Sequence, residues 1–91
     1  MKSLIISVDL GNPDFQAHSD EFVMLAEGAG AEIVGHLVAR RQRPDAAYFI
    51  GKGKLDEAAL LADSTEAEII LFDQPLSPAQ QRNIERALKR R

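Results

Sequence analysis

The residues best suited to chemistry form a basic, glycine-rich turn at positions 51–54. A short hydrophobic segment at 48–50 precedes the turn, and an apolar pattern typical of a helix follows it. Glycine allows a close approach of the backbone to a ligand, and the free N–H groups at the start of a helix favour an anion. The turn therefore predicts a phosphate site, although an ordinary strand-to-helix turn with two solvated lysines fits the same residues. The candidate residues are Gly51, Lys52, Gly53 and Lys54.

The familiar motifs of nucleotide sites and catalytic sites are absent from the sequence. The turn is not a P-loop, because the chain has no G-x-x-x-x-G-K-[ST] pattern, and the dinucleotide pattern G-x-G-x-x-G is missing as well. Without cysteine there is no disulfide and no thiolate metal site. No Ser/His/acid set can be assembled either. The residues therefore favour a binding module over an enzyme, and they predict neither a catalytic residue nor a metal site.

Three further residues are better explained by structure than by chemistry. Asp9 and Asp73 each follow an apolar run, where two carboxylates could serve as a phosphoacceptor or hold magnesium. An Asp in that position more often caps the next turn. His36 lies among apolar residues with no second His, Cys or acid at a suitable spacing, so we expect a partly buried structural histidine.

Charge is distributed in blocks along a chain whose net charge is −3. Residues 40–54 and 77–91 each carry five Lys or Arg against a single acid, whereas the intervening segments are acidic. Basic blocks of this kind neutralise phosphates without reading bases. Few aromatic residues accompany them, so folded duplex or ribosomal RNA fits this surface better than single strands do.

Hydrophobic periodicity and turn residues predict alternating strands and helices. The predicted strands cover residues 2–8, 31–41 and 68–72, and residues 48–50 are either a brief strand or an extended entry into the turn. The predicted helices run from 19 to between 28 and 30, from 54 to 63, and from 78 to the end. Ser19-Asp20 is the expected start of the first helix. Ser77, Pro78 and Gln80 form a capping box for the last one. The expected buried stripes are Phe22, Leu25, Ala26 and Ala29, then Leu55, Ala58, Ala59 and Ala62, then Ile84, Ala87 and Leu88.

This order predicts an α/β domain with a mostly parallel β-sheet and helices on both faces. Ligands of such sheets collect at the carboxyl ends of the strands, where residues 9–12, 40–43, 51–54 and 73–77 converge. Arg40 and Arg41 are therefore expected beside the turn, and Arg82 in the second basic block completes the set of phosphate or RNA candidates.

Two motifs connect this chain to a known family. Residues 48–57, a strand ending in Phe72-Asp73, and residues 76–85 (LSPAQQRNIE) together resemble the N-terminal domain of HflX-type GTP-binding proteins. The resemblance extends over most of the chain, and it implies a single α/β domain over residues 1–91. Members of the family are cytoplasmic, ribosome-associated GTPases that act on the large ribosomal subunit.

The resemblance also implies what lies outside this chain. It ends at Arg91, before the domain's final strand, the helical hairpin and the G domain that binds GTP and magnesium. By resemblance this fragment is an RNA-contacting and regulatory domain without catalysis of its own, which works with its own G domain. ATP or GTP binding at the 51–54 turn is a further expectation carried over from some members.

Two other functions remain open at this point, and the fragment has an expected assembly. The same turn would suit a small nucleotide-binding module similar to universal-stress proteins, or it would be a tight turn in an interaction scaffold. A missing last strand leaves a bare sheet edge, which predicts a homodimer or strand exchange. The first apolar run ends at Asp9, too short for a signal peptide or a membrane span, so a cytoplasmic protein is expected.

Overall fold

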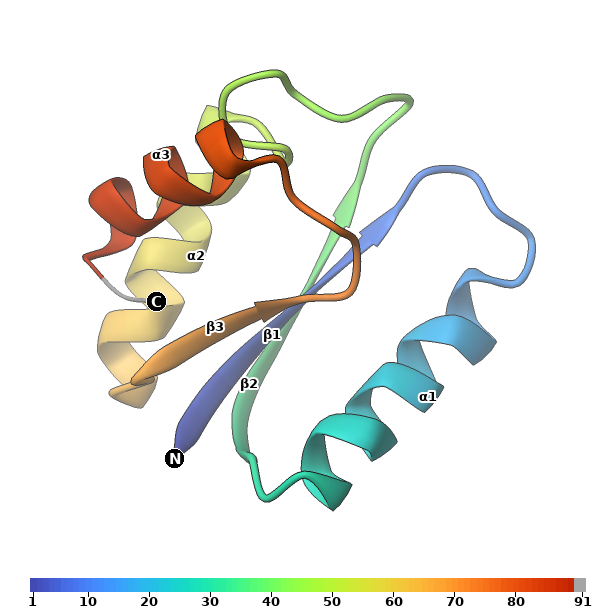
Figure 1. The fold of residues 1–91 in the computed structure, drawn as a ribbon, viewed down its shortest axis with the longest axis vertical. Coiled ribbons are helices and arrows are strands. Elements are labelled where there is room, and N and C mark those ends of the chain that lie inside the picture. Colours follow the sequence, from blue (N-terminus) through green and yellow to red (C-terminus); the bar gives the residue numbers. More distant parts are fainter. Residues whose placement is uncertain (90–91) are drawn as a thin grey trace.

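The computed structural model describes residues 1–89, and within them strands and helices alternate along the chain. The strands pair in parallel in the order β2-β1-β3. Helix α1 covers one face of the sheet, and α2 and α3 cover the other (Figure 1). The α/β class and the helices on both faces are thereby confirmed. The elements are β1 (Lys2–Asp9), α1 (Phe15–Gly28), β2 (Glu32–Arg40), α2 (Lys52–Thr65), β3 (Ile69–Phe72) and α3 (Pro78–Leu88).

Strand β1 occupies the centre of the sheet and is buried on both faces, as its continuous apolar sequence predicts. All six residues from 3 to 8 are buried. Because side chains alternate along a strand, Leu4, Ile6 and Val8 enter the main core beneath α2 and α3. The alternate residues Ser3, Ile5 and Ser7 turn toward α1, and two of these three are serines rather than apolar residues. The two faces of the sheet are therefore chemically different.

The contact between α1 and the sheet is polar where the sequence predicted an apolar stripe. Ser19 is the buried residue of α1, and its Oγ lies 2.8 Å from Oγ of Ser7 in β1. The same Ser7 oxygen lies 2.7 Å from Nε2 of His36 in β2. The predicted stripe is wrong in part, since Leu25 is 65% exposed and Ala29 lies just beyond the helix. His36 is exposed rather than partly buried as predicted, and its ring contacts the Ser7 hydroxyl.

Helix α1 begins four residues earlier than its predicted Ser19-Asp20 cap. A turn centred on Asn12 starts it, because the backbone N–H of Phe15 donates to the Asn12 carbonyl at 3.0 Å. The Asn12 side chain also accepts the Asp14 N–H at 2.8 Å. This local turn provides the first hydrogen bonds of the helix, so Ser19 is free to face the sheet from the second turn.

A bulge in β2 brings this strand close to the core. The pairing shifts between Ser3 and Leu4, so Ser3 opposes Ile33 whereas Leu4 opposes Gly35. A Cβ at position 35 would lie 2.9 Å from Cδ1 of Leu4. Glycine is therefore required here for a close approach of a leucine rather than for a turn.

Helices α2 and α3 supply the apolar half of the core. Leu55, Ala58 and Ala62 of α2 are buried as predicted, and so are Ile84 and Leu88 of α3. The third expected residue of α3, at position 87, is exposed. The helix ends at position 88 instead of continuing to the chain end, and positions 90–91 lie outside the described residues.

The start of α3 confirms the predicted capping box. The Ser77 hydroxyl accepts the Gln80 backbone N–H at 3.1 Å, and the Gln80 side-chain oxygen accepts the Ser77 N–H at 2.9 Å. Pro78 occupies the first helical position, where its missing N–H costs nothing.

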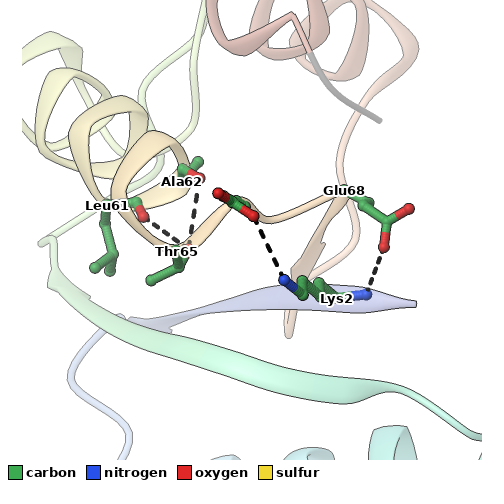
Figure 2. Close-up of polar contacts among 6 residues, drawn as sticks. Lys2, Leu61, Ala62, Thr65 and Glu68 are labelled. Atoms are coloured by element: carbon green, nitrogen blue, oxygen red, sulfur yellow. Dashed lines mark hydrogen bonds and ion pairs between the residues drawn. The ribbon is translucent and has the colours of Figure 1, made fainter.

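The amino edge of the sheet is closed by contacts around Lys2 (Figure 2). Its backbone N–H donates to the Glu68 carboxylate at 3.0 Å, and its amino group lies 3.6 Å from the Glu66 carboxylate. Behind these, the Thr65 hydroxyl donates to the Leu61 carbonyl at 2.8 Å and so closes the end of α2. The opposite, carboxyl edge of the sheet is formed by loops.

Within residues 1–89, no helix has the length and apolar character needed to cross a membrane.

Candidate phosphate-binding cavity

An open cavity of about 590 Å³ lies at the carboxyl edge of the sheet, between the end of β2 and the start of α2. Six predicted site residues meet in it, although strand β2 and the turn are separated by ten residues of loop. Arg82, the seventh, is exposed on α3 and does not line the cavity, so its part in binding stays a prediction. The lining residues are Val38, Ala39, Arg40, Arg41, Ile50, Gly51, Lys52, Gly53 and Lys54.

The glycine-lysine segment is the first turn of α2 and not a loop before it. The helix starts at Lys52 instead of the predicted Lys54, and Gly51 is its N-cap with φ 83° and ψ 160°. The first backbone N–H bonded back along the helix belongs to Leu55, which donates to the Gly51 carbonyl at 3.0 Å. The N–H groups of residues 52–54 therefore lack intrahelical acceptors, and no side chain caps them. They form a ready set of donors for an anion.

Arg41 places a guanidinium directly against this helix start. A Cβ built on Gly51 would lie 2.6 Å from Nη1 of Arg41, so the side chain occupies the space that only glycine leaves open. The Nε group donates to the Arg43 carbonyl at 3.4 Å. Among the described residues, no carboxylate lies within ion-pair distance of Arg41. A positive group thus lies beside the positive end of a helix without a compensating acid, an arrangement that an anion would stabilise.

The other three cations of the cavity have acidic neighbours, but these pairs are weak. Side chains of Lys52 and Arg40 are 72% and 86% exposed, and exposed pairs contribute about 0–1 kcal/mol. Such pairs can reorganise around a ligand at little cost. The pairs are Arg40–Asp9 at 3.9 Å, Lys52–Asp56 at 3.4 Å and Lys54–Glu57 at 3.0 Å.

The segment before the helix is a tight loop and not the brief strand or extended entry predicted at 48–50. Asp45 and Phe49 form an isolated antiparallel bridge, with N–H to carbonyl distances of 2.8 and 3.0 Å. Phe49 adopts φ 67°, a left-handed conformation that is rare for an aromatic residue. Its ring is buried and meets Phe72 edge to face, with centroids 6.4 Å apart. The loop thus reverses the chain and delivers it to Gly51.

Two amide side chains of α3 hold this loop, and sequence reasoning missed both. Nδ2 of Asn83 donates to the Ala47 carbonyl at 3.1 Å. Nε2 of Gln80 donates to the Asp45 carbonyl at 2.8 Å. The capping box uses the side-chain oxygen of Gln80 and leaves its NH₂ group without a partner. From the sequence, this unused donor was the one indication of a second hydrogen bond. The second sequence motif, at residues 76–85, is therefore in direct contact with the loop that leads into the first.

Asp9 and Asp73 each make a structural hydrogen bond at this edge. One Asp9 oxygen accepts the Gly11 N–H at 2.9 Å, which confirms the expected turn cap. Asp73 is buried and accepts the Val8 N–H at 2.9 Å, so it joins β3 to β1 instead of capping a turn. Its second oxygen is buried with no partner in the described part of the chain. Within that part, no group of three His, Cys, Asp or Glu residues could hold a metal.

Comparison with known proteins places the whole arrangement in a family. The family described as GTP-binding GTPase N-terminal matches residues 16–91, which include the cavity and both motifs. The GTPase HflX of Escherichia coli K12 is 44% identical over 66 residues, covering 72% of this chain and 16% of that protein. The GTPase HflX of Lacrimispora saccharolytica is 35% identical over 86 residues, covering 93% of this chain and 20% of that protein.

A more divergent relative aligns along nearly the full chain. The GTPase HflX of Caldanaerobacter subterraneus is 29% identical over 87 residues, covering 96% of this chain and 20% of that protein. The chain thus spans about a sixth to a fifth of the length of these relatives. On the family match over most of its residues, the chain belongs to the GTP-binding GTPase N-terminal family, whose members include HflX GTPases.

Proposed function

We propose that this chain is the RNA-contacting and regulatory N-terminal domain of an HflX-like GTP-binding protein that acts on the large ribosomal subunit. In this proposal, the basic cavity binds phosphate groups of ribosomal RNA in the cytoplasm. GTP and magnesium belong to a G domain outside these residues, with which the domain works.

The observation that carries the proposal is the position of Arg41. Its guanidinium contacts Gly51 at the N-terminus of α2, and no carboxylate of the described residues pairs with it. An RNA phosphate would accept hydrogen bonds from the guanidinium and from the free N–H groups of residues 52–54. The cavity has no aromatic lining residue on which a nucleotide base would stack, which favours a backbone ligand over a free nucleotide.

The test is the salt dependence of binding to purified large ribosomal subunits. We expect affinity to fall steeply with salt, because each phosphate contact releases counterions. Lys52→Ala combined with Lys54→Ala should weaken binding and reduce the slope of log affinity against log salt by about 2, roughly one per lysine. Arg41→Ala should weaken binding further, since it removes the cation that has no acidic neighbour. Pelleting of subunits at 3 to 4 salt concentrations, on the order of 50–200 mM, measures both quantities.

The control is Lys2→Ala, which removes one positive charge from the opposite edge of the sheet. It should change neither the affinity nor the slope beyond the effect of net charge. Equal affinities of the double lysine variant and the unaltered chain would place the contact elsewhere. Amide shifts around residues 51–55 on addition of ATP or GTP, without any binding of subunits, would replace RNA by nucleotide as the ligand.

A further inference from the structure

We propose that α3 sets the geometry of the phosphate-binding cavity through Gln80 and Asn83, which act as positioning residues. Neither side chain lines the cavity, and both act through the loop that leads into it. This inference rests on the proposed function, because it concerns the regulation of the same site.

The Gln80 side chain makes two hydrogen bonds that have different roles. Its oxygen accepts the Ser77 N–H at 2.9 Å and caps α3, while its NH₂ group donates to the Asp45 carbonyl at 2.8 Å. Asn83 lies one turn further along and donates to the Ala47 carbonyl at 3.1 Å. Both donors point from the same helix into the same loop. The start of α3 and residues 45–47 are therefore fixed relative to each other.

The loop needs such an external support because it contains an unfavourable conformation. Phe49 has φ 67°, which persists only when surrounding contacts hold it. Inside the loop, the Asp45 carboxylate accepts the N–H groups of Ala47 and Tyr48 at 3.0 and 2.8 Å. Asp45 is thus held by α3 through its carbonyl and in turn organises the residues that precede Phe49.

The chain passes from Phe49 through Ile50 to Gly51, so the loop conformation determines where α2 begins. Gly51 must keep φ 83° for the N–H groups of the first turn to face the cavity beside Arg41. A shift of α3 would move both donors relative to Asp45 and Ala47 and release the loop. The affinity of the cavity for phosphate should therefore depend on the position and the capping of α3.

The decisive variant is Gln80→Glu, compared with Gln81→Glu. Glutamate is a standard residue at this position of a capping box, so α3 keeps its cap. It cannot donate to the Asp45 carbonyl, so only the link to the loop is lost. Gln81→Glu adds the same charge one residue away, where the native side chain is exposed and donates only within α3, to Glu85. Asn83→Ala removes the second donor without any change of charge.

Phosphate affinity is measured by titrating the protein with inorganic phosphate and following the amide shifts of residues 51–55. We expect Gln80→Glu to weaken binding by about 3- to 10-fold, the loss of one hydrogen bond, and Asn83→Ala by a similar factor. Gln81→Glu should bind within about twofold of the unaltered chain, since its charge lies outside the cavity. Loss of this hydrogen bond should itself lower the free energy of unfolding by about 0.5–1.5 kcal/mol, and a larger fall in urea unfolding would indicate a merely structural loss.

A second readout separates this inference from the proposed function. In the absence of phosphate, Gln80→Glu should shift the Gly51 amide signal and speed hydrogen exchange at Phe49, whose N–H is bonded to Asp45. If the unaltered chain does not bind large ribosomal subunits but these signals change only in Gln80→Glu, the proposed function fails and the positioning role stands. If Gln80→Glu matches Gln81→Glu in both signals, the positioning role is wrong whatever the cavity binds.

Discussion

At the scale of single residues, two glycines separated by one lysine in the same basic turn have opposite roles. Gly51 has φ 83°, and a Cβ there would meet Nη1 of Arg41 at 2.6 Å. Gly53 lies inside α2, and beyond its chain neighbours and the nearby helix backbone no atom of the described residues lies within 4 Å of a built Cβ. The repeated Gly-Lys sequence conceals this difference, because the backbone conformation of Gly51 and the position of Arg41 in the folded chain create it.

Alanine substitutions at these two positions should therefore change stability in opposite directions. We expect Gly51→Ala to lower the free energy of unfolding by about 1–3 kcal/mol, because alanine is strained at positive φ and displaces Arg41. Gly53→Ala should raise it by about 0.4–1 kcal/mol, since it restricts the unfolded chain and suits a helix. Urea unfolding followed by circular dichroism gives both values. A neutral Gly51→Ala would contradict the observed conformation of the N-cap.

The sequence predicted most of the cavity but not what supports it. The sequence alone predicted that Arg40, Arg41 and residues 51–54 lie close together, because parallel strands end at the same edge of a sheet. The left-handed Phe49 and the bond from Gln80 to Asp45 could not be predicted, since a long-range hydrogen bond leaves no periodic pattern. These contacts became visible only with the fold.

At the scale of the elements, α3 and α1 show which helix boundaries can be predicted. The start of α3 uses side chains three residues apart, so its signal is local and was read correctly. The start of α1 depends on a turn at Asn12, while Ser19, the expected cap, is needed against the sheet. Ser19 is a residue type that commonly caps helices, but here it makes a buried polar contact. Sequence spacing alone does not distinguish these two roles.

Removal of the α3 cap should be measurable as a loss of stability. We expect Ser77→Ala to lower the free energy of unfolding by about 0.5–2 kcal/mol, because the Gln80 backbone N–H loses the hydroxyl that accepts its hydrogen bond. Ser64→Ala is the matched control, since this exposed serine lies inside α2 and donates only to a carbonyl of its own helix. Its effect should remain within about 0.5 kcal/mol. Equal urea midpoints for the two variants would contradict a contribution of the cap.

At the scale of the whole molecule, one side of the sheet remains apolar and unpaired. Within the described residues β3 is an edge strand, with an open cavity of about 240 Å³ on the α3 side. Another of about 220 Å³ lies on the α1 side, and Leu71 lines both. An exposed apolar edge strand is a template for pairing with another chain.

The chain of residues 1–91 should consequently self-associate in a concentration-dependent way. Sedimentation velocity over a range of about 10–500 μM should detect a dimer or a larger assembly, because such edges associate at micromolar to millimolar concentration. Leu71→Lys should shift the equilibrium toward monomer, since a charge on an edge strand opposes pairing. Circular dichroism of the same samples verifies that the variant is folded. A monomer throughout this range would contradict the expectation.

The order of the strands also has a consequence for how the domain is made. The central strand β1 leaves the ribosome before its two partners, β2 and β3. Ser3 of β1, for example, pairs with Ile33 of β2 and with Ile69 of β3, which is synthesised much later. Synthesis proceeds at about 5–20 residues per second, so β1, the most buried strand, waits several seconds for its second neighbour. Productive folding is therefore delayed until β3 has emerged, and a nascent chain stalled before that point would expose β1 to chaperones.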